Sequence, residues 1–191
     1  MKYIIATFIL IILFSSCKHK NPKVVIETDL GVIVIELYEN QAPVTSKNFI
    51  KYIDEKRWGD ATFYRVVTST NQPENNVKIE VIQGGLYEDD HPQVLPPIIH
   101  ENTSVTGIKH LDGVISMARY EPGTATFEFF ICVGNQPSLD YGGDRNMDNE
   151  GFAAFGKVVE GMNVVLKIHN QPEKNQYLEP RILINNMQVL Q

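Results

Sequence analysis

Two polar side chains stand out because each lies inside a short apolar stretch. Arg65 is the one cation in Phe63–Val67 (FYRVV), and Gln83 is the one polar side chain in Val81–Gly85 (VIQGG). β-Branched and aromatic residues are typical of strands, and glycines at the end of the second stretch indicate a turn. Side chains alternate along a strand, which places Arg65 on the same face as Phe63 and Val67. If the two stretches pair as a hairpin, a guanidinium and a carboxamide lie side by side on an apolar sheet and can bind a polar backbone there.

Most other residues that can do chemistry favour structural roles. Cys132 lies in an apolar run with no histidine near it in sequence, which favours a packed residue over a nucleophile. The acidic loop Asp140–Glu150 resembles the start of a calcium loop, but Asn149 stands where a glycine is expected, so a solvated turn is favoured over an ion site. No metal or cofactor is expected, because ligand spacing is also lacking among the histidines at 19, 91, 100, 110 and 169.

The chain begins with the features of an exported lipoprotein. Lys2 precedes a nearly unbroken apolar run from Tyr3 to Phe14, which is too short for a comfortable membrane span and matches a secretory signal. Two serines then precede Cys17, which resembles the lipobox of bacterial lipoproteins and implies cleavage before Cys17 and acylation of its thiol. An ordinary signal peptide or an uncleaved anchor is the alternative. We therefore expect a signal peptide over 1–16, an acylated tether over 17–22, a domain over 23–191, and a lipid anchor to a membrane of the bacterial cell envelope.

Length and charge restrict the partners of this domain. The chain has 191 residues and a formal net charge of −6, and removal of residues 1–16, whose one charge is Lys2, changes this to −7. An acidic chain argues against nucleic acid as a partner, and the length predicts one domain. We expect that domain to be monomeric.

The pattern along the chain is mainly β. Strands are predicted over 24–28, 32–37, 63–67, 81–85, 113–118, 126–133, 152–159 and 182–190, with amphipathic helices over 43–55 and 161–169. Trp58 follows the first helix and is expected to pack or to lie at a rim. Many short strands with two helices predict an antiparallel barrel capped by the helices.

Five motifs follow one another in a characteristic order: FYRVV at 63–67, QGG at 83–85, GVISMA at 113–118, FFI at 129–131 and FGKVV at 155–159. Together with ETDLG at 27–31 and the pairs at 42–43 and 48–49, this order resembles that of the cyclophilins, the peptidyl-prolyl cis-trans isomerases. The resemblance covers residues 23–191. It implies a closed eight-stranded antiparallel barrel capped by two α-helices, with a groove for proline-containing polypeptides on the outer face of the sheet.

The resemblance also implies roles for individual residues. Arg65 is expected to donate to the prolyl nitrogen of a twisted amide, Gln83 to hold the substrate backbone and steady the arginine, and Phe130 to form the floor of the proline pocket. Alternation supports the last role, because it separates Glu128 and Phe130 from the core-facing residues of the same strand. Further substrate-binding residues are expected at Phe63, Val81, Ala118, Arg119, Glu128, Leu139 and Phe152.

The chain departs from the family pattern around this groove. Tyr64 replaces the usual histidine beside the arginine but is expected to point to the opposite face, and Glu80 stands at a position that is usually aromatic. Insertions occupy 68–78, where a loop is expected to border the groove, and 141–151. Arg119 replaces an asparagine.

Glu128 replaces a glutamine, and this departure carries the largest consequence. A carboxylate on the face of Phe130 can pair with Arg65 or Arg119 and compete with substrate, or it can favour a basic substrate. The leading hypothesis is a cofactor-free prolyl isomerase of exported proteins that assists their folding. The alternatives are a non-catalytic proline-peptide binding module or chaperone of the same fold, and a β-barrel lipoprotein that binds small ligands.

Overall fold

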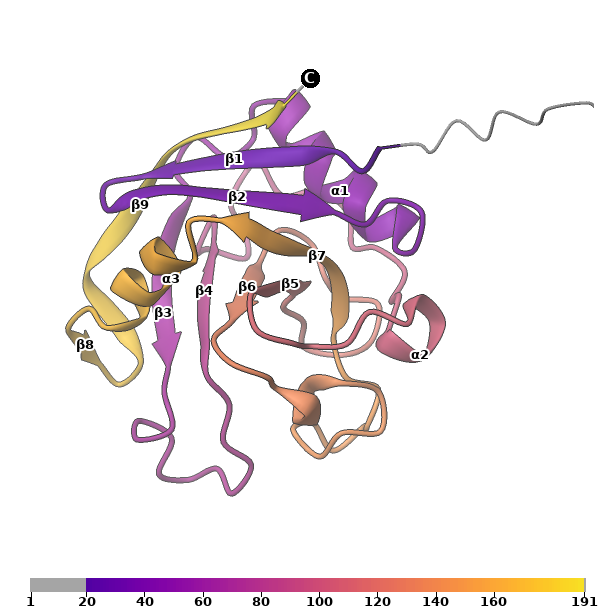
Figure 1. Ribbon diagram of the computed structural model, residues 1–191, viewed down its shortest axis with the longest axis vertical. Helices are drawn as coiled ribbons and strands as arrows, with labels where there is room; N and C mark the ends of the chain where they lie inside the picture. The colour runs from indigo at the N-terminus through magenta and orange to yellow at the C-terminus, as the bar shows by residue number, and fades with distance from the viewer. Residues whose placement is uncertain (1–19, 191) are drawn as a thin grey trace, which may run out of the picture.

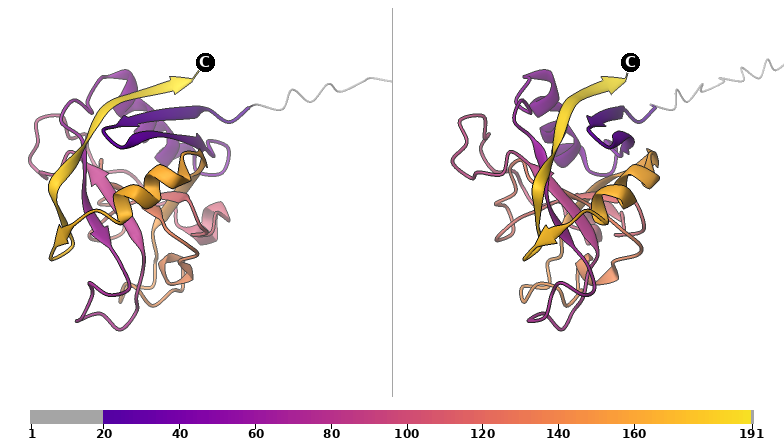
Figure 2. Two further views of the ribbon diagram at one scale, coloured as in Figure 1. Left: turned by 60° about the vertical axis from the view of Figure 1, so that its left-hand side comes forward. Right: turned by 90° about the vertical axis from the view of Figure 1, so that its left-hand side faces the viewer.

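The strands close into one antiparallel barrel (Figures 1 and 2). The computed structural model describes residues 20–190. Neighbouring strands follow the order β1-β2-β7-β5-β6-β4-β3-β9, and β1 also pairs with β9, which closes the ring. The eight-stranded closed antiparallel barrel is thus confirmed. Its strands are β1 Lys23–Thr28, β2 Gly31–Leu37, β3 Thr62–Val67, β4 Val81–Gly85, β5 Val114–Met117, β6 Phe129–Cys132, β7 Ala153–Glu160 and β9 Tyr177–Leu190.

Two longer helices cover the barrel, as predicted: α1 (Pro43–Asp54) packs on β7 and β9, and α3 (Met162–His169) packs on β2, β3 and β4. The start of α1 has an unusual cap. Ala42 precedes the helix and has no side chain that can accept a hydrogen bond, so the Glu101 carboxylate accepts from the backbone of Val44 and Thr45 at 3.2 and 2.8 Å. A carboxylate at a helix N-terminus is also favoured by the helix dipole. Two short elements complete the set, α2 (Thr103–Thr106) and the 3₁₀ turn η1 (Pro137–Leu139).

Side chains fill the interior of the barrel. Phe129 meets Phe49 of α1 edge to face, with ring centroids 5.4 Å apart, and Phe49 also lies 5.3 Å from Phe155. Trp58 packs against Phe49 at 5.4 Å and is buried, which confirms its predicted packing role. Phe129 and Ile131, the core-facing positions predicted for β6, are likewise buried in this core. A filled interior speaks against a small-ligand site inside the barrel, and it leaves the outer face of the sheet as the place for chemistry.

The C-terminal part differs from the sequence prediction. The last strand begins at Tyr177, five residues before the predicted start, and it forms a hairpin with the two-residue strand β8 (Glu173–Lys174). Polar residues in this stretch concealed the strand, because no apolar alternation is present before Ile182. The hairpin turn, Asn175 and Gln176, carries positive φ angles of 54° and 74°. This turn lies beside β3, where it reaches Arg65.

Within residues 20–190, no helix has the length and apolar character that a bilayer crossing requires. The predicted signal peptide over 1–16 and the acylation site at Cys17 lie outside the described residues, so both stay predictions.

Candidate functional site

A groove of about 540 Å³ lies on the outer face of the sheet, over β3, β4 and β6. The strands supply its floor, and the segments after β3, β5 and η1 supply its walls. Most of the predicted site residues lie here. Its lining consists of Tyr64, Arg65, Ile79, Val81, Gln83, Tyr87, Asp89, Ala118, Arg119, Tyr120, Glu128, Phe130, Leu139, Arg145, Asn146, Phe152 and Tyr177.

A β-bulge in β3 decides which side chains reach the groove. Phe63 pairs with Gly84 and Arg65 pairs with Gln83, so Tyr64 is an extra residue without its own partner on β4. Phe63 therefore points into the core with 0% exposed, while both Tyr64 and Arg65 line the groove. Two predictions are wrong for this reason: Phe63 is not a groove residue, and Tyr64 does not face away from Arg65. Regular alternation cannot continue through a bulge.

Two carboxamides hold the guanidinium of Arg65. Nη1 donates to Oε1 of Gln83 at 2.8 Å, and Nε and Nη2 donate to Oε1 of Gln176 at 3.0 and 2.5 Å. Of the five N–H groups of an arginine side chain, one on Nη1 and one on Nη2 thus have no partner within the described chain. Both partners are neutral, so the positive charge of Arg65 is not compensated by a carboxylate in ion-pair contact. Arg65 can offer a fixed cation and two donors to a ligand.

Glu128 does not capture this cation. The structure gives no ion pair between Glu128 and Arg65 or Arg119 within residues 20–190; its carboxylate instead accepts a hydrogen bond from the Tyr64 hydroxyl, which in turn accepts one from Nε2 of Gln83 at 2.8 Å. Burial raises the pKa of Glu128 above its ordinary value, and the charge of Asp89 adds to this, although the Tyr64 bond and Arg65 lower it. Burial and the Glu128 charge also raise the pKa of Tyr64. The predicted pairing of Glu128 with Arg65 or Arg119 is therefore not found within residues 20–190.

An apolar cluster lies beside Arg65 and Gln83. Phe130 and Phe152 meet edge to face with centroids 5.3 Å apart. Val81, Leu139 and Ala118 complete the walls of this cluster. Cys132 also belongs to it; burial raises the pKa of its thiol, in agreement with a packed rather than a nucleophilic role. The cluster offers a surface of suitable character for a proline ring, which contributes on the order of 1–3 kcal/mol when buried.

Three hydrogen-bonded polar residues support Phe130 from behind. The His110 ring stacks on Phe130 with centroids 6.0 Å apart, its Nδ1 lies 2.8 Å from Oδ1 of Asp140, and its Nε2 lies 3.0 Å from Oγ of Ser116. Burial lowers the pKa of His110. Burial by itself would raise the pKa of Asp140, but hydrogen bonds from His110 outweigh it and lower that pKa. Ser116 is 0% exposed, so the three residues form a support for the floor and not a nucleophile.

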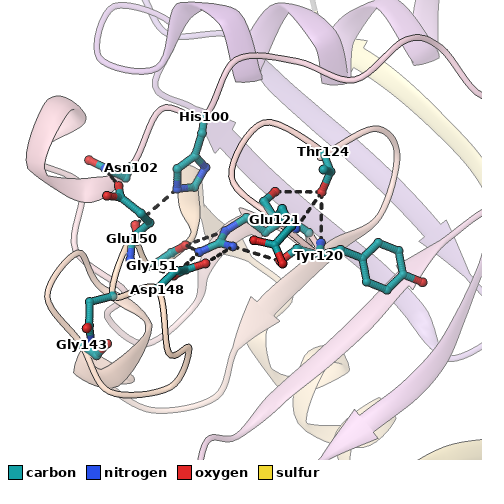
Figure 3. Close-up of polar contacts among 11 residues, drawn as sticks. His100, Asn102, Tyr120, Glu121, Thr124, Gly143, Asp148, Glu150 and Gly151 are labelled. Carbon is teal, nitrogen blue, oxygen red and sulfur yellow. Dashed lines mark hydrogen bonds and ion pairs between the residues drawn. The ribbon is translucent and has the colours of Figure 1, made fainter.

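Arg119 lines the groove, but its guanidinium is hydrogen-bonded to the loop that contains Asp148 and Gly151. It donates to both carboxylate oxygens of Asp148 at 2.7 and 3.0 Å and to the Gly151 carbonyl at 2.8 and 2.6 Å. Figure 3 shows these contacts, with Asp148 and Gly151 of the loop labelled. The side chain of Arg119 is 1% exposed, so the predicted substrate contact is not available to its charge. Asp148, part of the apparent calcium pattern, has an arginine as its partner.

Comparison with known proteins places this geometry in a family. The family model described as cyclophilin type peptidyl-prolyl cis-trans isomerase/CLD matches residues 23–189. A peptidyl-prolyl cis-trans isomerase of Acinetobacter baylyi is 34% identical over 162 residues, which cover 84% of this chain and 79% of that protein. Peptidyl-prolyl cis-trans isomerase B of Escherichia coli is 34% identical over 146 residues, 76% of this chain and 82% of that protein.

The chain belongs to the cyclophilin-type peptidyl-prolyl cis-trans isomerases. The family confirms the predicted isomerase class. A crystal structure of a Cryptosporidium parvum cyclophilin type peptidyl-prolyl cis-trans isomerase shares the fold, with a TM-score of 0.70 at 21% identity over 90% of this chain and 98% of that one.

Both insertions of this cyclophilin have a defined structure at the groove, and they lie side by side at the lower end of the barrel in Figure 1. Gln72 organises the first: its Nε2 donates to the carbonyls of Thr68 and Ile79 at 2.6 and 2.8 Å. Arg145 of the second insertion donates to Oε1 of Gln72 at 2.8 Å. Glu80, which stands at the usually aromatic position, accepts from the backbone N–H of Ser69 at 3.2 Å, and the neighbouring Ile79 lines the groove instead.

Three residues at or beside the groove have roles that the sequence does not reveal. Gln176 lies more than a hundred positions from Arg65 and in a turn of no recognisable motif, so no sequence signal indicated the contact. Tyr64 lies on the groove side because of the β-bulge, which side-chain alternation does not reveal. Arg145 lies in the second insertion, whose polar residues predict only a solvated turn.

Proposed function

We propose that this cyclophilin isomerises X-Pro bonds of exported polypeptides while a lipid on Cys17 holds it at a membrane of the bacterial cell envelope. The observation that carries the catalytic part is the state of Arg65 next to the apolar cluster around Phe130: within residues 20–190 this cation has no carboxylate partner and two of its N–H groups are unengaged.

The reaction requires stabilisation of a twisted amide. Amide resonance gives rotation about a peptide bond a barrier of ~18–20 kcal/mol, and uncatalysed X-Pro exchange takes roughly 10–100 s. When the amide twists, resonance is lost and the prolyl nitrogen gains a lone pair that can accept a hydrogen bond. A donor that meets this nitrogen in the twisted state lowers the barrier without acting on the planar ground state.

Arg65 suits this task because its guanidinium stays charged and its donors are fixed. Gln83 holds one side of the guanidinium, and Phe130 lies on the adjacent strand, since Gln83 pairs with Phe130 across β4 and β6. A proline ring on Phe130 thus places its nitrogen near the donors of Arg65. Val81, Leu139, Ala118 and Phe152 extend the apolar contact, and Tyr64 secures Gln83.

Location and clients rest on the sequence. The apolar run before Cys17 and the two serines favour export and acylation, and an acylated protein would meet its clients as extended chains in the envelope. Assistance to the folding of such chains follows from the slowness of uncatalysed proline isomerisation, which can limit folding.

Exchange spectroscopy tests the activity. The full chain in mild detergent should increase the cis–trans exchange rate of a short Ala-Pro peptide at catalytic concentration. Saturable peptide binding without faster exchange would instead identify the non-catalytic binding module.

A separate experiment tests the anchor. The wild-type chain expressed in a bacterium should carry acyl groups by mass spectrometry and sediment with membranes, and Cys17→Ser should lose the acyl mass. Identical mass and sedimentation of the two forms would contradict acylation at Cys17.

A further inference from the structure

Arg145 lines the groove, and one edge of its guanidinium has no partner within residues 20–190. Its Nη1 donates to Oε1 of Gln72 at 2.8 Å and to the carbonyl of Val77 at 2.6 Å, and its backbone N–H donates to the Ser138 carbonyl at 3.2 Å. Within residues 20–190, Nε and Nη2 have no hydrogen-bond partner, and no carboxylate lies in ion-pair contact. Nε and Nη2 together form the edge with which a guanidinium binds both oxygens of a carboxylate.

This charge is retained in an unfavourable setting. Arg145 is partly buried. Burial lowers the pKa of its guanidinium, and the positive charge of Arg65 lowers it further. A desolvated cation beside a second cation is costly unless an anion compensates it. The chain as a whole carries a net charge of −6, so a positive end of the groove is a local feature and does not reflect general basicity.

The strand register places Arg145 and Glu128 at opposite ends of the groove. Arg145 bonds the carbonyl of Val77, at the Ile79 end where the chain enters β4. Glu128 immediately precedes Phe129, which pairs with Gly84 near the other end of β4. Gly84 follows Ile79 by five positions of extended chain, or ~16 Å at about 3.3 Å per residue. A proline on Phe130, between these ends, has a cation on one side and a carboxylate on the other.

We propose that Arg145 forms a carboxylate-binding subsite that selects polypeptides with an Asp or Glu side chain near the proline, on the side of the groove at Ile79 and Leu139. This rests on the proposed function, because it assigns a substrate class to the same groove. Two anchoring bonds from Nη1 fix the guanidinium in advance, so a ligand carboxylate meets a prepared edge.

Peptide pairs test the subsite without altering the protein. In the first series of peptides, Glu or Gln stands one or two positions before the proline, and in the second series it stands one or two positions after the proline. The exchange rate and the affinity of each peptide are measured by NMR in low salt. We expect one series to show a three- to tenfold preference for Glu over Gln that declines at high salt, as ion pairs do. Equal values for Glu and Gln in both series would overturn the subsite.

Variants assign the preference to Arg145. Arg145→Gln should abolish it and Arg145→Glu should favour Lys over Gln at the same position. The matched control is Arg181→Gln, which removes the same charge near Tyr87, whose ring it contacts at 3.4 Å, and should leave the preference intact. Persistence of the preference in a folded Arg145→Gln would also overturn the subsite.

The two proposals fail in distinguishable ways. Faster exchange of neutral peptides with no Glu preference leaves the isomerase standing and removes the subsite. If no peptide exchanges faster, the protein is not an isomerase of these peptides. The affinities of the Glu and Gln peptides then show by themselves whether the carboxylate subsite exists.

Discussion

Replacement of Gln176 by alanine should slow isomerisation although Gln176 lies outside every family motif. Its Oε1 accepts from both Nε and Nη2 of Arg65. Gln176 is itself fixed, because its Nε2 donates to the Asn71 carbonyl at 2.9 Å and its backbone carbonyl accepts from Val66 at 2.8 Å. Loss of the carboxamide releases one edge of the guanidinium and leaves Gln83 as its one remaining side-chain partner within residues 20–190.

The size of the effect follows from those two bonds. A hydrogen bond to a charged group contributes about 1.5–3 kcal/mol, and part of this is regained from water when the partner is removed. If about 1–2 kcal/mol of transition-state stabilisation depends on the fixed orientation, kcat/KM falls about 5- to 30-fold. The loss should appear in kcat, because the apolar cluster that binds the proline ring is unchanged and KM depends mainly on that contact.

Exchange rates measured over a range of peptide concentrations separate kcat from KM. Lys174→Ala, an exposed change in the same hairpin, serves as the control and should match the wild type. Gln176→Glu keeps acceptors for Arg65 but adds a negative charge beside it and removes the donor to the Asn71 carbonyl, so it should also lower kcat. A folded Gln176→Ala protein with wild-type kcat would refute the view that the hairpin positions Arg65.

Three further predictions concern stability. The pKa of Glu128 is raised in the folded protein, so ionisation of this carboxyl lowers the free energy of unfolding as the pH rises. Glu128→Gln should therefore increase Tm relative to the wild type at pH 8 and have less effect at pH 4. An equal increase in Tm at both pH values would contradict this explanation. The pKa of His110 is lowered in the folded protein, so the contribution of the neutral imidazole to stability is present above the ordinary histidine pKa near 6.5 and is lost as the pH falls. His110→Gln should therefore flatten the decline in Tm between pH 7 and pH 5. An unchanged decline would exclude the histidine as the cause of that decline. Asp148→Asn removes the bidentate bond to Arg119 and should lower Tm by about 2–4 °C for a loss of about 1 kcal/mol, with no change in Tm as the contrary result.

The barrel was predictable from sequence because its strands carry short β-branched and aromatic runs separated by glycine-containing turns. The motifs then supplied strand number and the identity of Arg65, Gln83 and Phe130, which the structure brings together across β3, β4 and β6. The local sequence pattern was sufficient to predict which face a side chain occupies wherever the strand alternates regularly.

The errors at the site have two physical causes. A β-bulge is a backbone irregularity that side-chain alternation does not reveal, and it reversed the faces of Phe63 and Tyr64. Polar loop residues carry no periodicity, so the partnerships of Gln176 with Arg65 and of Arg119 with Asp148 become visible only when distant segments meet. The bulge also gives Glu128 a partner other than Arg65, since it lets Tyr64 reach the carboxylate from the groove side.

The most direct test of the account is the exchange rate of an Ala-Pro peptide with the full chain and with its Arg65→Ala and Arg65→Lys variants. Loss of a positioned transition-state donor should lower kcat/KM by about 10²–10³-fold in Arg65→Ala. Arg65→Lys should also remain slow, because an ammonium cannot hold both glutamines and still direct two fixed donors into the groove. A folded Arg65→Ala protein that accelerates exchange as well as the wild type would contradict the central role of this arginine.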